Sequence, residues 1–375
     1  MNALGEAARK ANVLVCVGPG GVGKTTVAAA LALRSALEGQ GALVCTIDPA
    51  KRLANALGLE ALGNAETLID AGHLAKAGLS PKAPMRAMML DMKRTWDELI
   101  EKRAQGEARQ AILGNRFYQS LSTALAGSQE YIAMEKLCEL RLQRDYPLIV
   151  LDTPPTAHAL DFLDAPNRIL DFLDQDAMKW VLTPALKAGK AGLKLFNLGG
   201  GFLTKQISKF IGTQTMEELA GFMVHMSGLY ESFRERARQT RTLLEAPTTR
   251  FVLVTGPMPE RTSEAARFLE LLKEHRLHVA AVVVNRVHQA PDDKLLAQAE
   301  ALGEPLKTKV LTTLREQTQL AAQDAKGVAW LKAHCGAVPI VEVPRFDLDV
   351  HDLQSLATTG RWLWGDPSRS GPAPH

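Results

Sequence analysis

The segment Gly18-Pro-Gly-Gly-Val-Gly-Lys-Thr-Thr26 decides the fold of this 375-residue chain. It matches the pattern G-x-x-x-x-G-K-[ST] and stands between an apolar run at residues 13–17 and an Ala- and Leu-rich segment at residues 26–37. Glycines let the backbone curl so that successive N–H groups converge on phosphate oxygens, and a following helix directs its positive end at the same point. The order strand, loop, helix therefore predicts a phosphate-binding loop.

The residue types in this loop also predict how a nucleoside triphosphate is held. The expected phosphate-binding residues are Gly18, Gly20, Gly21, Val22, Gly23, Lys24, Thr25 and Thr26. The motif places the Lys24 ammonium to neutralise the outer phosphates and the Thr25 hydroxyl to ligate magnesium. We therefore expect ATP and Mg²⁺ as cofactors, and ATP hydrolysis as the reaction.

Strand-like apolar runs recur along the chain and predict the rest of the fold. They occupy residues 42–47, 148–151, 251–254, 279–284 and 338–343. Runs that are apolar throughout are typical of parallel strands covered on both faces, and strands joined by helices favour such a sheet. We expect an α/β fold of the P-loop class, with a mostly parallel sheet flanked by helices, built from residues 10–75, 146–164 and 248–350.

Two long stretches, about 80–145 and 165–247, lack strand signals and predict helical insertions that form a subdomain. Within the second, Phe222, Met223 and Met226 recur at helical spacing. An internal helix that packs on its neighbour explains this stripe. The alternative is an adaptable apolar surface for a client, because methionine packs against many shapes. The tail, residues 365–375, is rich in Pro, Gly and Ser and is expected to be disordered.

Polar residues close three of the predicted strands. Asp48 follows the strand at 42–47, Asp152 follows the strand at 148–151, and Asn285 closes the strand at 279–284. Ligands collect at the carboxyl ends of parallel strands, where one carboxylate can hold magnesium and another can orient an attacking water. The alternative for each Asp is a helix cap or turn former, and Asn also commonly ends strands.

The overall composition limits the kinds of partner that the protein is expected to bind. The formal net charge is +3, and 23% of residues are charged, so no nucleic-acid partner is expected. The four cysteines are scattered without a C-x-x-C pair, which argues against a disulfide framework or a paired-thiolate zinc site. No apolar run approaches the length that spans a bilayer, so we expect a cytoplasmic protein that can still act at a membrane.

These motifs together resemble the ArsA-type ATPases, which include the arsenite-pump ATPase and the ATPase that targets tail-anchored membrane proteins. The resemblance covers most of the chain. It rests on G-x-G-G-V-G-K-T-T at residues 18–26, D-P-A at 48–50, D-T-x-P-T-x-H at 152–158 and V-V-N at 283–285.

The resemblance implies further roles for named residues. Asp48 corresponds to the carboxylate that activates water, Asp152 and Thr25 to magnesium ligands, and Asn285 to an adenine contact. The residues of the implied switch, which couples the terminal phosphate to movement, are Asp152, Thr153, Pro155, Thr156 and His158. Members of the family close as dimers around nucleotide, and in the targeting branch closure assembles an apolar groove for a client helix.

Two positions depart from the family pattern. Pro19 stands where members commonly carry a lysine that reaches the partner subunit's nucleotide, and Met258 stands where they often carry glutamate. Proline has no ammonium and cannot play that part. We expect either a homodimer or a heterodimer with a lysine-bearing paralogue, acting on a hydrophobic client helix or a membrane protein. An efflux ATPase for anions or metalloids and a positioning ATPase of the ParA/MinD kind remain alternatives.

Overall fold

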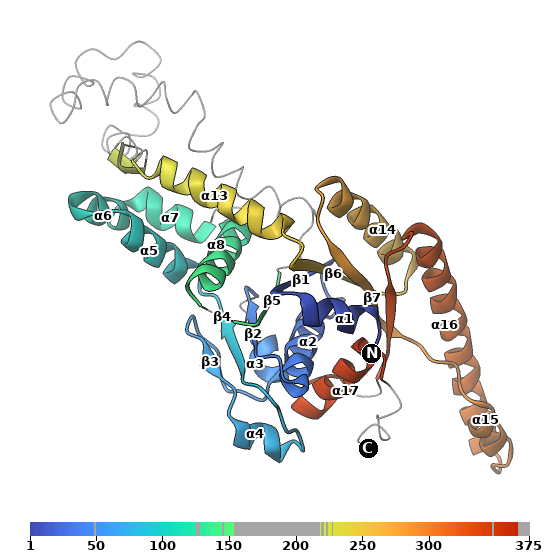
Figure 1. Ribbon diagram of the computed structural model, residues 1–375. Helices are drawn as coiled ribbons and strands as arrows, with labels where there is room; N and C mark the ends of the chain where they lie inside the picture. Colours follow the sequence, from blue (N-terminus) through green and yellow to red (C-terminus); the bar gives the residue numbers. More distant parts are fainter. Residues whose placement is uncertain are drawn as a thin grey trace. The chain divides into compact units, whose positions relative to one another are not determined.

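The computed structural model describes residues 1–48, 50–124, 128–144, 146–153, 218, 221–222, 224–226, 228–346 and 349–366. The chain divides into two compact units. Residues 1–90, 140–159 and 243–375 form the first, here called the sheet unit, and residues 91–139 and 160–242 form the second, here called the helical unit. In sequence, the helical unit consists of two insertions that interrupt the sheet unit (Figure 1).

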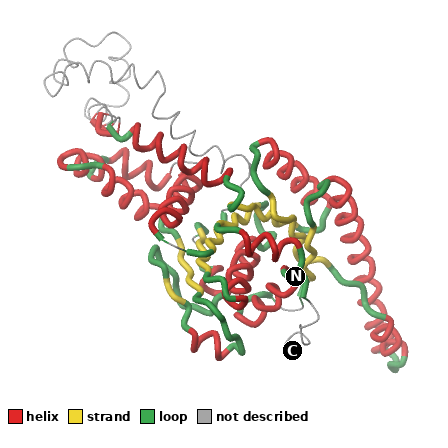
Figure 2. The backbone as a smooth tube through the Cα atoms, in the orientation of Figure 1, coloured by secondary structure: helices red, strands yellow, loops and turns green. Residues whose placement is uncertain are grey.

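One eight-stranded sheet organises the sheet unit, with the strands in the order β3-β4-β2-β5-β1-β6-β7-β8. The strands are β1 (Val13–Val17), β2 (Ala42–Thr46), β3 (Thr67–Leu68), β4 (Met85–Met89), β5 (Leu148–Asp152), β6 (Thr249–Thr255), β7 (Val279–Val287) and β8 (Ile340–Pro344). Only the short edge strand β3 runs antiparallel to its neighbour among the described residues. Figure 2 shows the strands in yellow as one layer.

Helices cover this sheet. They are α1 (Ala3–Lys10), α2 (Lys24–Glu38), α3 (Arg52–Ala56), α4 (Ala71–Lys76), α14 (Pro259–Glu274), α15 (Asp293–Glu300), α16 (Leu306–His334) and α17 (Leu353–Leu363). The Ala-rich α2 is buried along most of its length and packs against α17, where a Cβ at Gly360 would lie 3.2 Å from the Ala30 carbonyl oxygen. Small residues at this contact let the two helices approach closely. The packing fixes the start of α2, and with it the phosphate loop.

The helical unit contains α5 (Met92–Arg103), α6 (Gly106–Leu113), α7 (Arg116–Ala124), most of α8 (Ser128–Gln143) and most of α13 (Tyr230–Glu245). Its core is aromatic. Trp96 stacks on Tyr131 with ring centroids 5.6 Å apart, and Phe233 packs against both rings. Such rings bury large apolar areas, so a few of them hold together helices that are individually short.

The predicted α/β class is confirmed, and the six predicted strands appear as β1, β2, β5, β6, β7 and β8. The expectation that helices begin at about residue 80 is wrong, because β4 occupies Met85–Met89 and the first helix of the insertion starts at Met92. Methionine and alanine are weak strand formers, so this strand exists mainly through its pairing with β2. The expected disordered tail lies almost wholly outside the described residues. None of the described helices combines the length and the apolar character that a membrane crossing requires.

Candidate active site

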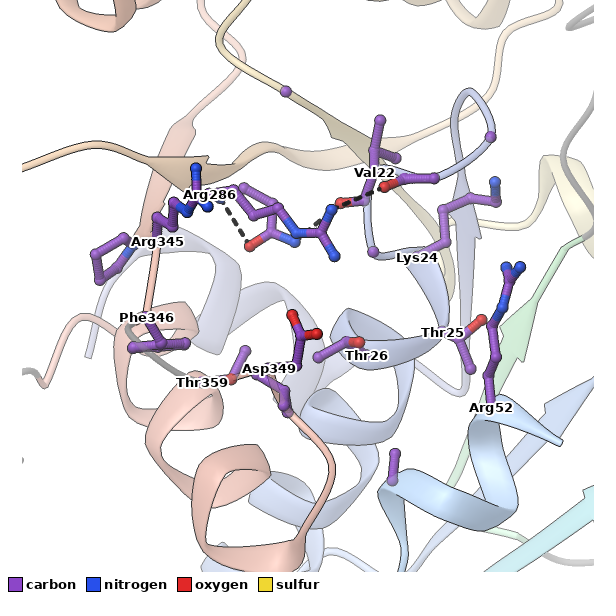
Figure 3. A pocket seen from close by; sticks show the side chains of 18 of the residues that line it. Val22, Lys24, Thr25, Thr26, Arg52, Arg286, Arg345, Phe346, Asp349 and Thr359 are labelled. Carbon is purple, nitrogen blue, oxygen red and sulfur yellow. Dashed lines mark hydrogen bonds between the residues drawn. The ribbon is translucent and has the colours of Figure 1, made fainter. Parts of the chain in front are cut away.

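An open cleft of about 1300 Å³ lies in the sheet unit at the carboxyl ends of its strands (Figure 3). The phosphate loop, the segments that follow β2, β5, β6, β7 and β8, and parts of α16 and α17 line it. Parallel sheets present their strand ends at one edge, so residues far apart in sequence meet there. The predicted residues Asp48, Thr153 and Asn285 all line this cleft.

Glycine is required at two points of the phosphate loop. Gly18 has φ +142°, and a Cβ there would lie 2.1 Å from the Val254 carbonyl oxygen. Gly23 has φ +92°, and a Cβ there would lie 2.4 Å from Asn285 Nδ2. Any side chain at these positions would displace β6 or the residue that closes β7. The glycines of the motif therefore fit both the curl of the loop and its contact with the sheet.

The Lys24 ammonium is 6% exposed and folds back over the loop, donating to the carbonyl oxygens of Gly18 and Pro19 at 2.9 Å each. Burial lowers the pKa of Lys24, and the nearby Asp152 carboxylate opposes this effect. These two hydrogen bonds hold the Lys24 ammonium against the phosphate loop. An entering triphosphate offers it stronger acceptors than two carbonyl oxygens.

Asp152, the last residue of β5, is 1% exposed and accepts two hydrogen bonds on one oxygen. Its Oδ2 accepts from Thr25 Oγ1 at 2.7 Å and from Thr46 Oγ1 at 2.8 Å. Its Oδ1 is buried and finds no hydrogen-bond partner among the described residues. Burial raises the pKa of Asp152 to about 6, despite the hydrogen bonds from the two threonines. A hydroxyl and a carboxylate with a vacant oxygen fit the oxygen ligands that Mg²⁺ prefers.

Asp48 lies next to this pair and is linked to it. Its Oδ1 accepts from the Ala50 amide at 2.9 Å, and its own amide donates to Thr46 Oγ1 at 3.2 Å. Because Thr46 also donates to Asp152, one threonine hydroxyl joins the two predicted carboxylates. The parallel pairing of β2 with β5, which sets Thr46 beside Asp152, creates this link. The Thr46 hydroxyl thus links the Asp152 carboxylate to the backbone amide of Asp48.

The described residues include only Asp152 and Thr153 of the predicted switch. Thr153 Oγ1 donates to the carbonyl oxygen of Cys16 at 2.8 Å and so ties the segment after β5 to β1. The other predicted switch residues, Pro155, Thr156 and His158, lie outside the described residues. Asp152 and Thr153 thus anchor the base of the predicted switch to the sheet.

Asn285 is drawn into the phosphate loop. Its Nδ2 donates to the Val22 carbonyl oxygen at 2.9 Å, and its Oδ1 accepts from the Arg286 amide at 3.0 Å. Arg286 has φ +62°, and its Nη1 donates to the Gly21 carbonyl oxygen at 3.3 Å. The end of β7 therefore holds the loop from outside, a role that the sequence did not suggest for Asn285.

Several residues of the cleft escaped the sequence analysis. Nδ1 of His288 lies 2.7 Å from the Asp324 Oδ2 acceptor, and its Nε2 lies 3.0 Å from Arg345 Nη1. Arg286 and His288 lie in β7 and just after it, and Arg345 follows β8. The rule that selected Asn285, polar residues at strand ends, would have found them. Asp324, on α16, carries no such signal.

The predicted client surface is wrong for two of its three residues. Phe222 and Met226 are 2% and 7% exposed, and both belong to the aromatic core of the helical unit with Trp96 and Phe233. A helical stripe of apolar residues fits an internal face and an exposed one equally, and here it fills the interior. Met223 lies outside the described residues.

The site combines a phosphate loop after β1, the Thr25 hydroxyl beside Asp152 with its vacant oxygen, and a second carboxylate, Asp48, just after the neighbouring strand β2. These features define a P-loop nucleotide hydrolase. The particular family is equally clear. Residues 11–320 match the model of the ArsA ATPase family, described as anion-transporting ATPases. The chain therefore belongs to this family and is an ATPase.

Individual relatives agree with this placement. The chain is 27% identical over 361 residues to ATPase ARSA1 of Chlamydomonas reinhardtii. The matched region covers 92% of this chain and 42% of ARSA1. It is 24% identical over 366 residues to ATPase GET3B of Arabidopsis thaliana, covering 92% of this chain and 77% of that protein. ATPase get3 of Schizosaccharomyces japonicus is 26% identical over 279 residues, 74% of this chain and 75% of the relative. The chain thus spans less than half of ARSA1 and about three quarters of the other two.

Proposed function

We propose that this ATPase couples Mg-ATP binding and hydrolysis to the closure of a dimer that handles a hydrophobic client or a membrane partner. One observation carries the proposal. Asp152 ends β5 inside the active site, and only seven residues of chain separate it from the second insertion of the helical unit, which starts at residue 160. A change at the terminal phosphate therefore has a short covalent route to the helices.

The chemistry assigns one task to each residue. The loop amides and Lys24 bind the phosphates, and Thr25 with Asp152 would hold Mg²⁺, which supplies positive charge for the β- and γ-phosphate oxygens. Asp48 orients the attacking water. Thr46, hydrogen-bonded to Asp152 and to the Asp48 amide, keeps the two carboxylates in register.

Ordering of the switch by the terminal phosphate, and its release after hydrolysis, is a common way for such sites to drive a larger change. The segment from Asp152 to His158 is the proposed switch. The resemblance to the branch that targets tail-anchored membrane proteins supports a targeting role, and the family description supports a link to transport. Because Phe222 and Met226 are core residues, we place the client-binding surface elsewhere on the dimer.

Pro19 shapes the proposed dimer. Without an ammonium at this position, a partner subunit receives no lysine from this chain. A heterodimer with a lysine-bearing paralogue and a homodimer with catalysis inside each subunit are the two arrangements. The mass of the isolated protein with Mg-ATP, measured together with its turnover, separates them. Full turnover by an isolated homodimer excludes an obligatory paralogue.

Trapping tests the client. Asp48→Asn keeps an isosteric side chain but removes the charge that orients water, so the variant is expected to bind ATP and hydrolyse it slowly. Purified from cells in Mg-ATP, it should retain client or partner proteins that wild type releases. Asn55→Ala, a cleft variant outside the proposed chemistry, serves as the control. The proposal fails if Asp48→Asn turns over ATP at the wild-type rate, or if it retains nothing beyond the control.

The family description also favours a second function, the ATPase subunit of an anion efflux system. All four cysteines of this chain are buried and outside disulfides, so thiolate capture of a metalloid would require their exposure. Stimulation of turnover by arsenite, absent with phosphate or sulfate, would favour this function over client targeting.

A further inference from the structure

We propose that Arg52 is a catalytic residue: its guanidinium leaves Asp48 when ATP binds and holds the terminal phosphate within the same subunit. The inference deepens the ATPase function and rests on it. Arg52 is the first residue of α3 and lines the cleft. Figure 3 shows its side chain on the side of Lys24 and Thr25, whereas Arg345 and Phe346 lie at the other end.

Arg52 lies within electrostatic reach of the phosphate-binding lysine. Its positive charge is one of the causes that lower the pKa of Lys24, after burial. Lys24 and Arg52 line the same cleft, and two positive charges there favour an anion that carries several charges. A triphosphate that reaches Lys24 therefore enters the cleft that Arg52 also lines.

The partners of the cleft arginines single out Arg52. Arg261 pairs with Glu264 on its own helix, Arg286 donates to Gly21, and Arg345 contacts His288. Arg52 instead pairs with Asp48, the proposed water-orienting carboxylate, through Nη1 and Oδ2 at 3.2 Å. The guanidinium thus occupies the carboxylate oxygen that hydrolysis needs.

The two members of this ion pair differ in freedom. The Asp48 side chain is 17% exposed, and its other oxygen is held by the Ala50 amide. The Arg52 side chain is 65% exposed, so its charge is well screened and its hold on Asp48 is weak. When a stronger acceptor arrives, the guanidinium is the member that moves.

A terminal phosphate is such an acceptor. It carries more charge than a carboxylate and offers paired oxygens to the planar fork of arginine. The exchange frees Asp48 Oδ2 to accept a hydrogen bond from water at the moment the phosphate becomes clamped. ADP lacks this phosphate, so with ADP bound Arg52 stays on Asp48 and the water site remains blocked.

The bond changes are those of simple hydrolysis. The water oxygen bonds to the terminal phosphorus, the bond from that phosphorus to the bridging oxygen breaks, and its electron pair leaves on ADP. The water proton ends on inorganic phosphate or in solvent. Arg52 acts on the charge of the three terminal oxygens in the transition state, where an arginine in cis or trans contributes factors on the order of 10³ to 10⁵ in other phosphate hydrolases.

Two substitutions at Arg52 test the proposal. Arg52→Ala should lower kcat by about 100-fold or more, by the effect that such arginines have elsewhere. Its KM for ATP and its affinity for Mg-ADP should stay within about threefold, since Lys24 and the loop bind the remaining phosphates. Arg52→Lys keeps the charge without the fork and should fall between Arg52→Ala and wild type. Neither variant should form the complex with ADP and aluminium fluoride as tightly as wild type does.

Arg94→Ala is the matched control. Arg94 has a side chain 67% exposed and also pairs with a carboxylate four residues along a helix, Glu98 at 3.0 Å, but lies in the helical unit. It should leave turnover unchanged. Thermal denaturation of all variants shows whether each is folded.

Two results would overturn the proposal. One is turnover by folded Arg52→Ala within twofold of wild type. The other is an equal loss of Mg-ADP affinity and of kcat, which would make Arg52 an ordinary binding residue. Absence of turnover in the wild-type protein would instead refute the ATPase function, so the two failures are distinguishable.

Discussion

The sheet unit and the helical unit each bury a carboxylate, and they treat it differently. In the sheet unit, Asp152 receives two neutral hydroxyls on one oxygen. In the helical unit, Glu135, 4% exposed, receives two guanidinium groups on one oxygen, from Arg103 at 2.7 Å and from Arg236 at 2.9 Å. Each carboxylate also has a second oxygen that is buried without a hydrogen-bond partner among the described residues, so the two differ in the charge of their donors. The two guanidinium groups neutralise Glu135 and tie helices together, whereas the described donors to Asp152 are neutral.

The surroundings fit this contrast. Asp152 lies beside the open cleft, and burial raises its pKa to about 6. Glu135 lies beside Tyr131 on α8, and the Arg103 guanidinium sits over the Phe233 ring, 5.6 Å from its centroid. The first carboxylate is prepared for function at a cost to stability. The carboxylate of Glu135 instead stabilises the packing of helices in the helical unit, whose apolar core is small.

Loss of Lys24 should give the largest effect, and it tests the functional role assigned to the sheet unit. Lys24→Ala removes the ammonium that faces the phosphates, and turnover should fall by about 10³-fold or more, as expected for the loss of a preorganised charge at a developing anion. Its hydrogen bonds go only to loop carbonyls, so the unfolding temperature should change little. Steady-state kinetics and calorimetry check both points.

Lys332→Ala, which breaks the exposed pair with Glu342, is the control for the loss of a lysine. It should match wild type in both measurements. A Lys24→Ala protein that is active but unstable would reverse the distinction between the two units.

Loss of Glu135 tests the structural role assigned to the buried carboxylate of the helical unit. Glu135→Ala leaves the partly buried Arg103 and Arg236 without their carboxylate, which should lower the free energy of unfolding of the helical unit by about 3 kcal/mol. Lys102→Ala, which breaks the exposed pair with Glu139 at 2.8 Å, should cost less than about 1 kcal/mol. Denaturant titration followed by tryptophan fluorescence measures both, because Trp96 lies in this core.

Nucleotide affinity supplies the second half of that test. Below the unfolding transition, Glu135→Ala should bind Mg-ADP as wild type does. An affinity loss as large as the stability loss would mean that the buried Glu135 cluster serves the active site as well.

Substitution of Asp152 should move stability in the opposite direction. The folded pKa, about 6, lies above the unfolded value, so the ionised carboxylate weakens folding at any pH above about 6. Asp152→Asn removes this cost and should raise the free energy of unfolding by about 3 kcal/mol at pH 8 without Mg²⁺, from a shift of about two pKa units. The gain should shrink as the pH falls below 6 and vanish near pH 4. It should be accompanied by loss of Mg²⁺-dependent turnover.

A melting series of wild type and Asp152→Asn between pH 4 and pH 8 checks the sign. Equal stability of the two proteins at every pH would show that Asp152 is already satisfied without a cation. The contrast with Glu135 would then disappear.

The sequence predicted the parts of this comparison that are local. The phosphate loop is a continuous motif, and β1, β2 and β5 are continuous apolar runs, so both were evident. The meeting of Thr46 with Asp152 depends on β2 lying beside β5, which spacing along the chain does not reveal. The strand β4 was missed because Met85-Arg-Ala-Met-Met89 has little strand preference of its own.

The helical unit was harder to interpret for a related reason. The apolar stripe that includes Phe222 and Met226 is compatible with a client surface and with a core. Its partners, Trp96 and Tyr131, lie about 90 to 130 residues earlier in the chain and become neighbours only in the folded unit. Glu135, Arg103 and Arg236 likewise come from three helices, and no pairing of charges was visible before the fold was known.

Loss of Asn285 should give the smallest effect and tests a polar contact that is structural within the functional unit. Asn285→Ala removes the hydrogen bond to Val22, so the loop keeps only the Arg286 hydrogen bond of the two described from β7, and Mg-ATP affinity should fall about tenfold, or about 1.4 kcal/mol. Asn285→Asp turns a donor into an acceptor facing the same carbonyl and should weaken binding further. Both variants should lose affinity for GTP by the same factor if Asn285 acts through the loop. A loss confined to ATP would show instead that its amide reads the adenine ring.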